Sequence, residues 1–162
     1  MPNHKELVEN LYQAFRVYGP GSAINCTYCY SADELSYYQT APIDQLSVEA
    51  SRTALWETGD HWENSETYRH FLPRMLEIMG PPHMVEDLYP KHIFETLVYQ
   101  RFSTWPEGER EAVVAYLKAI RGIISFFDEG EANEWDEGMR SICDGTQFAA
   151  ADVPDELLSN ES

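Results

Sequence analysis

Apolar residues recur at every third or fourth position along most of this chain, which is the spacing that lines one face of an α-helix. The first stripe contains Leu7, Leu11, Phe15 and Tyr18, and it ends where Gly19 begins a Gly-Pro-Gly sequence. Similar stripes predict further helices near residues 31–38, 47–57, 65–79, 90–98, 107–127 and 131–142. The helix that reaches Phe127 is expected to be the longest, and the one after it the weakest.

No alternating pattern of the strand type lasts long enough to compete with these helices. We therefore predict an all-α fold, an irregular multi-helix domain of short antiparallel helix pairs. A solenoid-like stack is the alternative, because the helix pairs are about as long as known helical repeats of ~34–47 residues. The sequence shows no repeated motif to support that alternative.

Local signals predict where several helices begin. Ser31 is followed three positions later by a glutamate, which is the pattern of a capping box, and Thr104 stands in a similar relation to Glu107. Ser47 is a good N-cap for the helix that follows it. Pro73 lies inside a predicted helix and should kink it or mark a fresh start.

Charge divides the chain unevenly. The 162 residues include 28 acidic and 11 basic ones, which gives a formal net charge of −17. Residues 128–162 alone carry eleven acidic residues and one basic residue. We therefore predict a helical domain over residues 1–127 and an acidic C-terminal segment over residues 128–162, partly helical or flexible.

This negative charge limits the choice of partner. It repels the phosphates of nucleic acids and the surface of anionic membranes, so we expect neither as a partner. No apolar run approaches the ~20 residues of a membrane helix, and the N-terminus lacks the apolar core of a signal peptide, so we expect a cytoplasmic protein. The charge favours a basic protein partner, although a solvated acidic surface without any partner is the simpler interpretation.

Cys26 and Cys29 form the most specific chemical motif of the sequence. Two residues between cysteines allow both sulfurs to bind one tetrahedral zinc ion, which needs two further ligands. We select Cys143 and His70 for these places, since no second close pair of ligands is present. The expected cofactor is therefore none or, at these four residues, zinc.

The cysteine pair is also compatible with a redox role or with simple packing. A Cys-x-x-Cys just before a helix can act in thiol redox chemistry, because the helix dipole stabilises a thiolate. The surrounding acidic residues oppose that effect, and no βαβ pattern accompanies the motif. The plainest interpretation is two reduced cysteines packed as small apolar groups in a loop.

Arg74, Tyr28 and Tyr30 are candidates for binding a ligand or a partner. The planar guanidinium of Arg74 suits carboxylate or phosphate, although Glu77 lies three positions away and can pair with it on the same helix face. Tyrosines cluster in and after the cysteine loop, and tyrosine is enriched at protein interfaces. Ordinary core packing is the alternative for both features.

An ordered set of motifs between residues 7 and 127 resembles a group of uncharacterised bacterial proteins. The set consists of Leu11-Tyr-Gln-Ala-Phe15, Tyr18, Pro20, Cys26-x-x-Cys29, Pro42-Ile-Asp-Gln-Leu46-Ser47, Thr58-Gly-Asp60, His70-Phe-Leu-Pro-Arg74-Met-Leu-Glu77 and Trp105-Pro-Glu-Gly-Glu109-Arg110. The resemblance implies a bacterial, cytoplasmic, helical protein, and it implies no particular chemistry.

These features lead to two expectations about function. The sequence contains no phosphate-binding glycine loop, nucleophile elbow or His-Glu-x-x-His motif, so an enzyme is the less expected class. We expect a non-catalytic acidic interaction protein of the inhibitor or immunity type that binds a basic protein. The alternative is a metal- or thiol-dependent protein that uses Cys26 and Cys29.

Overall fold

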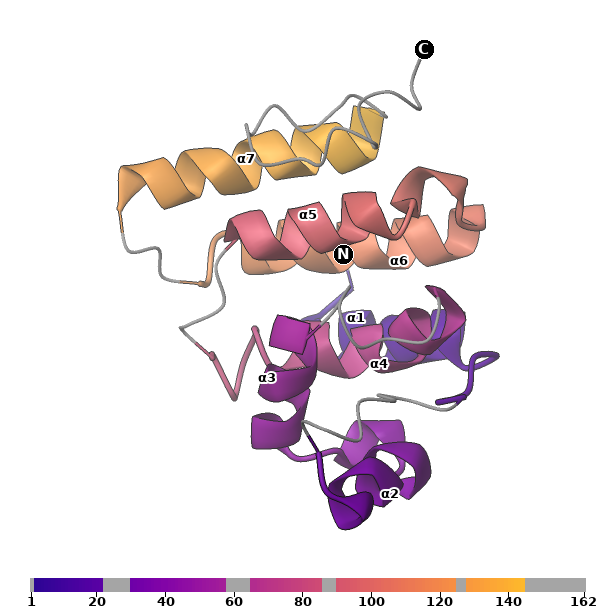
Figure 1. Ribbon diagram of the computed structural model, residues 1–162. Helices are drawn as coiled ribbons and strands as arrows, with labels where there is room; N and C mark the ends of the chain where they lie inside the picture. Colours follow the sequence, from indigo (N-terminus) through magenta and orange to yellow (C-terminus); the bar gives the residue numbers. More distant parts are fainter. Residues whose placement is uncertain (1, 22–29, 58–64, 86–89, 125–127, 145–162) are drawn as a thin grey trace. The chain divides into compact units, whose positions relative to one another are not determined.

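The computed structural model describes residues 2–21, 30–57, 65–85, 90–124 and 128–144. These residues form seven α-helices and two short 3-10 helices, and no strand occurs among them (Figure 1). The predicted all-α fold is therefore confirmed. Contacts group the chain into two compact units, Met1–Val85 and Glu86–Ser162, which are described one at a time below.

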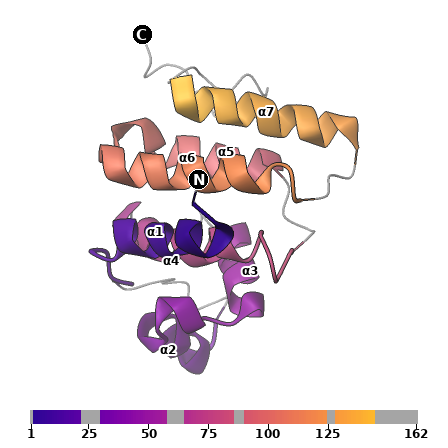
Figure 2. The ribbon, with the colours of Figure 1, turned by 180° about the vertical axis from the view of Figure 1, so that it is seen from behind.

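The first unit contains four α-helices and one 3-10 helix. They are α1 (His4–Phe15), α2 (Ala32–Thr40), η1 (Ile43–Gln45), α3 (Val48–Glu57) and α4 (Ser65–Glu77). Helices α1 and α4 lie side by side, and α3 stands across their direction (Figures 1 and 2).

The predicted stripe of α1 forms part of the core of this unit. Leu7, Leu11 and Phe15 are all buried, as their spacing on one helix face predicted. The side chain of Asn3 accepts a hydrogen bond from the backbone N–H of Glu6 and so caps the helix. The apolar spacing thus predicted the existence of α1 and the face that it buries, whereas Tyr18, which the stripe also included, lies beyond the end of the helix and is half-buried.

Two predicted caps are present in the structure. Ser31 Oγ accepts from the N–H of Glu34, and Glu34 Oε1 accepts from the N–H of Ser31, which completes the capping box of α2. Ser47 Oγ accepts from the N–H of Ala50 in the first turn of α3. Both helices therefore begin where local chemistry predicted.

Helix α4 is the most deeply buried helix of the first unit. Its core face contains Tyr68, Phe71, Leu72, Met75 and Leu76. The sequence predicted that Pro73 would kink the helix or start a new one, and the structure shows one helix continuing through this proline to Glu77. Packing on both sides of Pro73 maintains the helix despite the missing backbone donor.

The second unit contains three α-helices and one 3-10 helix. They are α5 (Pro90–Tyr99), η2 (Phe102–Thr104), α6 (Glu107–Ile120) and α7 (Glu129–Asp144). The three α-helices run beside one another within this unit (Figures 1 and 2). None of the described helices of the chain is long and apolar enough to cross a membrane.

Two predictions for α6 were wrong. Thr104 does not cap it, because the Thr104 hydroxyl donates to the carbonyl of Arg101 and Pro106 occupies the N-cap position without a side-chain hydrogen bond. The helix ends at Ile120, although the apolar stripe continues through Ile123, which is exposed. Gly122 lies two positions beyond this end, and glycine is unfavourable in the interior of a helix.

Helix α7 is the longest helix among the described residues, although its pattern was the weakest. It packs against α5, where the rings of Phe94 and Trp135 meet edge to face with centroids 5.2 Å apart. Gly138 lies so close to the ring of Phe94 that an added Cβ would overlap it. The sequence predicted a division after residue 127, whereas the contacts place α7 within the unit that begins at Glu86.

Candidate functional site

A cleft of about 710 Å³ opens in the first unit between α1, η1 and α4. This volume lies within the ~300–1,000 Å³ that is usual for small-ligand sites. Its lining residues are Val8, Glu9, Tyr12, Gln13, Phe15, Arg16, Tyr18, Ile43, Asp44, His70, Pro73 and Glu77. The lining combines apolar, aromatic and charged side chains from three elements.

Helical spacing explains how α1 contributes to this cleft. Val8, Tyr12 and Phe15 follow one another at steps of four and three residues, which places them on one face. Glu9, Gln13 and Arg16 have the same spacing one position further on, so they form a neighbouring polar stripe. Phe15 is buried, whereas Glu9, Gln13 and Arg16 are exposed.

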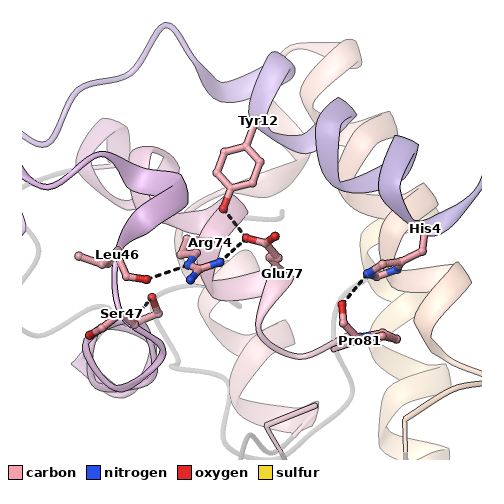
Figure 3. Close-up of polar contacts among 8 residues, drawn as sticks. His4, Tyr12, Leu46, Ser47, Arg74, Glu77 and Pro81 are labelled. Carbon is pink, nitrogen blue, oxygen red and sulfur yellow. Dashed lines mark hydrogen bonds and ion pairs between the residues drawn. The ribbon is translucent and has the colours of Figure 1, made fainter. Parts of the chain in front are cut away.

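A polar network connects the walls of the cleft (Figure 3). The Tyr12 hydroxyl donates to Glu77 Oε1 at 2.6 Å, and Arg74 Nη1 donates to the same oxygen, also at 2.6 Å. Arg74 Nε donates to the carbonyl of Leu46 at 2.9 Å. The Arg74–Glu77 pair, which the sequence spacing predicted, thus joins α1 and the segment after η1 to α4.

The environment fixes the charge of these groups. Burial, together with the hydrogen bond to Glu77, raises the pKa of Tyr12 far above its usual value, so its hydroxyl stays protonated. Burial lowers the pKa of Arg74, but the hydrogen bond and the negative charge of Glu77 outweigh it and raise that pKa overall. Tyr12 therefore serves as a neutral donor and Arg74 as a permanent cation.

His70 lies at the end of the cleft where α4 meets the residues after α1. Its Nδ1 donates to the carbonyl of Tyr18 at 2.9 Å, which fixes the proton on that nitrogen. Burial lowers the pKa of His70 despite the opposing effect of this hydrogen bond. Beside it, Arg69 donates to the Tyr18 hydroxyl at 2.7 Å and lies 5.2 Å from the ring centroid.

Three charged side chains of the lining are left unpaired within the part of the chain that the structure describes. Glu9 and Asp44 form no ion pair or side-chain hydrogen bond there, and neither does Arg16. All three are exposed. The cleft can therefore offer two carboxylates and one guanidinium to a ligand.

The predicted metal ligands fall in different parts of the chain. Cys26, Cys29 and the neighbouring Tyr28 lie outside the described residues. Cys143 is an exposed free thiol in the second unit, beside a smaller groove of about 420 Å³, whereas His70 belongs to the first unit. Among the described residues, no group of three or more His, Cys, Asp or Glu side chains could hold a metal ion. Zinc binding stays a prediction.

The remaining two candidates have internal contacts. Arg74 is buried, does not line the cleft, and directs its guanidinium to Glu77 and Leu46. The ring of Tyr30 meets that of Tyr38 nearly at right angles, with centroids 6.1 Å apart. A role for either residue in binding a partner stays a prediction.

The sequence did not predict the residues that line the cleft, apart from His70. The spacing of Glu9, Gln13 and Arg16 was the available signal, because it places opposite charges on one helix face. No family model, no curated protein and no solved structure matches this chain. The resemblance to a bacterial group therefore also stays a prediction.

Proposed function

We propose that this chain is a non-catalytic acidic protein that binds a basic protein partner, as inhibitors and immunity proteins do. The observation that carries the proposal is the imbalance of exposed charge. Among the described residues, twelve acidic side chains are exposed: Glu6, Glu9, Asp33, Glu34, Asp44, Glu49, Glu66, Glu107, Glu111, Asp128, Glu129 and Glu137. Five basic side chains are exposed: Lys5, Arg16, Arg101, Lys118 and Arg140.

The imbalance follows from the composition of 28 acidic and 11 basic residues, and several arginines are in addition engaged in contacts within the units. Arg74 pairs with Glu77, and Arg121 binds Asp136 through two hydrogen bonds of 2.9 and 3.3 Å. Arg110 donates to a backbone carbonyl, that of Trp105. Part of the positive charge is thus engaged in internal contacts, and the exposed carboxylates outnumber the exposed basic side chains among the described residues.

An excess of exposed carboxylates has two consequences for binding. It raises the rate of encounter with a positively charged protein, and it discourages acidic competitors. Both effects weaken as salt screens the charges, with a screening length of ~8 Å at physiological ionic strength. We place the protein in the cytoplasm, where the free thiol of Cys143 would stay reduced.

Affinity capture with the full chain tests the proposal. The protein is immobilised and exposed to a bacterial extract at low salt, and bound proteins are eluted by a salt gradient. We expect a basic protein to be retained in a fixed stoichiometry and, once purified, to bind at least about tenfold more weakly when salt rises from 50 to 300 mM.

The control surface carries an unrelated protein of similar size and similar negative charge. It separates specific recognition from simple ion exchange. The proposal is wrong if the chain retains nothing beyond this control. It is equally wrong if the retained partner is acidic, or if its affinity does not respond to salt.

A further inference from the structure

We infer that the cleft between α1, η1 and α4 binds an extended peptide segment with two opposite charges. In the bound state, a basic side chain of this segment pairs with Glu9 and Asp44, and a carboxylate of the same segment pairs with Arg16. The inference rests on the proposed function in assigning this segment to the basic partner. It goes further by naming the surface, the chemistry and the orientation of the bound chain.

The spacing of the charges sets the length of the ligand. Glu9 lies on α1 and Arg16, seven positions later, is the C-cap residue with helical backbone angles, so the two lie two turns apart on the same face. At 1.5 Å per residue the two positions are separated by about 10 Å along the helix axis. An extended peptide advances about 3.3 Å per residue, so three residues span this distance.

The surroundings of the charges favour a ligand from outside the fold. Glu77 also lines the cleft, but its Oε1 already accepts from Tyr12 and Arg74. Glu9, Asp44 and Arg16 have no such partners among the described residues, so their charges remain available. The protein thus provides both signs of charge on one hollow surface.

The apolar part of the cleft suits the stem of a long basic side chain. Val8 and the ring of Tyr12 lie next to the polar stripe of α1, and Pro73 lines the cleft from α4. Lysine and arginine stems pack against such surfaces while their charged ends reach polar groups. A nucleotide or a phospholipid headgroup fits less well, since Arg16 is the one unpaired guanidinium among the described lining residues to meet its phosphates.

Three short peptides test the inference with the full chain. The first is acetyl-Arg-Ala-Ala with a free C-terminal carboxylate. The second replaces arginine with citrulline, which has a similar shape and no charge, and the third carries a C-terminal amide. Titration followed by ¹⁵N NMR should shift amides of α1 and η1, and the first peptide should bind about two- to fivefold more tightly than either of the others.

Charge-neutralising variants assign each end of the ligand. Glu9→Gln and Asp44→Asn should remove the preference for arginine over citrulline and keep the preference for carboxylate over amide. Arg16→Gln should remove the preference for carboxylate over amide and keep the preference for arginine over citrulline. The matched controls Glu66→Gln and Asp33→Asn change the net charge equally at exposed positions outside the cleft lining, and both preferences should persist in them.

The inference is overturned if the arginine and citrulline peptides bind equally, or if the control variants change binding as much as the cleft variants do. Its failure can be told apart from failure of the proposed function. If a basic partner binds the Glu9→Gln and Asp44→Asn variants as tightly as it binds the control variants, the proposed role of the cleft is refuted and the proposed function is not. Selective peptide binding in the cleft without any retained basic protein refutes the proposed function alone.

Discussion

In the first unit, hydrogen bonds among Tyr12, Glu77 and Arg74 connect α1 to α4 beside an open cleft. Between α5 and α7 in the second unit lies an edge-to-face pair of rings, Phe94 and Trp135, with a glycine against it. Both contacts join helices that are distant in sequence. One does so through directional polar bonds and the other through close packing.

The difference shows how side-chain size controls where a fold leaves space. Helices approach more closely where small residues meet, and larger side chains hold them further apart. Gly138 permits a close approach in the second unit, whereas Tyr12 and Glu77 reach across between α1 and α4 in the first. We therefore expect the first unit to be sensitive to the loss of charge and the second to added volume.

The largest effect is expected from Arg74→Met. The substitution leaves Glu77 without its cation and the carbonyl of Leu46 without its donor, in a largely buried position. The free energy of unfolding should fall by about 3 kcal/mol. Urea denaturation measures the loss, and hydrogen exchange should locate it in α1 and α4 rather than in α5 and α7.

The double variant Arg74→Met, Glu77→Leu is the matched control. It removes both charges, so it should recover part of the lost stability, while the hydroxyl of Tyr12 loses its acceptor and the carbonyl of Leu46 still lacks its donor. An equal loss in the single and the double variant would show that the hydrogen bonds and packing of these side chains, rather than the uncompensated charge of Glu77, determine the stability of the first unit.

Gly138→Ala should give the next largest effect, in the second unit. The new methyl group would overlap the ring of Phe94, so α5 and α7 must separate or the ring must move. We expect a loss of about 2 kcal/mol in the free energy of unfolding. The thermal unfolding midpoint, measured with hydrogen exchange in α7, checks both the size and the place of the effect.

Gly108→Ala provides the comparison within the same unit. A Cβ at this position on α6 meets nothing within 4 Å, and alanine favours the helix by up to about 1 kcal/mol. Stability should therefore stay constant or rise. A similar loss at both glycines would contradict the importance of close packing at Gly138.

A smaller effect should appear as a pH dependence confined to the first unit. Burial lowers the pKa of His70 from its ordinary 6.5, so the unfolded state binds its proton more readily than the folded state does. The stability that His70 contributes is therefore complete above about pH 6.5 and falls as the pH decreases towards the folded-state pKa. Denaturation curves between pH 7.5 and 5.5 should show this slope.

His70→Asn separates this residue from the remaining histidines. Asparagine keeps an N–H donor for the carbonyl of Tyr18 and does not titrate in this range. The difference between the wild-type and variant curves should therefore decrease with falling pH. Parallel curves would show that the titration of His70 does not contribute.

The smallest effect is expected from Asp136→Asn in the second unit. Its partner Arg121 lies at the end of α6, and both side chains are more than a third exposed, so the loss should be below about 1 kcal/mol. The hydrogen bond from Arg121 lowers the pKa of Asp136 from 3.8. The contribution should be complete above about pH 4 and disappear as the pH falls through the folded-state pKa. It should also shrink in high salt.

Local features of the sequence predicted local structure well. The stripe of Leu7, Leu11 and Phe15 located α1, and the hydroxyls of Ser31 and Ser47 located the first turns of α2 and α3. These predictions depend on residues within one or two turns of each other. The spacing of Arg74 and Glu77 likewise predicted their ion pair, because four residues of one helix are sufficient to form it.

Features that depend on distant residues were not predictable in this way. Tyr12 and Leu46 meet the Arg74–Glu77 pair from 65 and 28 positions away, and no local pattern specifies such contacts. Helix α7 looked weak because Gly138 and Ser141 do not count as apolar, although both are buried in the unit. The cleft arises from three elements together, so its unpaired charges became visible only in the fold.

The antiparallel arrangement of α1 and α4 has a consequence for synthesis. Pairs such as His4 with Pro81 and Tyr12 with Glu77 are 77 and 65 positions apart, so α1 emerges from the ribosome long before its partner exists. At a synthesis rate of roughly 5–20 residues per second, the apolar face of α1 stays exposed for several seconds. During that interval the newly made N-terminus offers a binding surface to chaperones, and completion of α4 ends it.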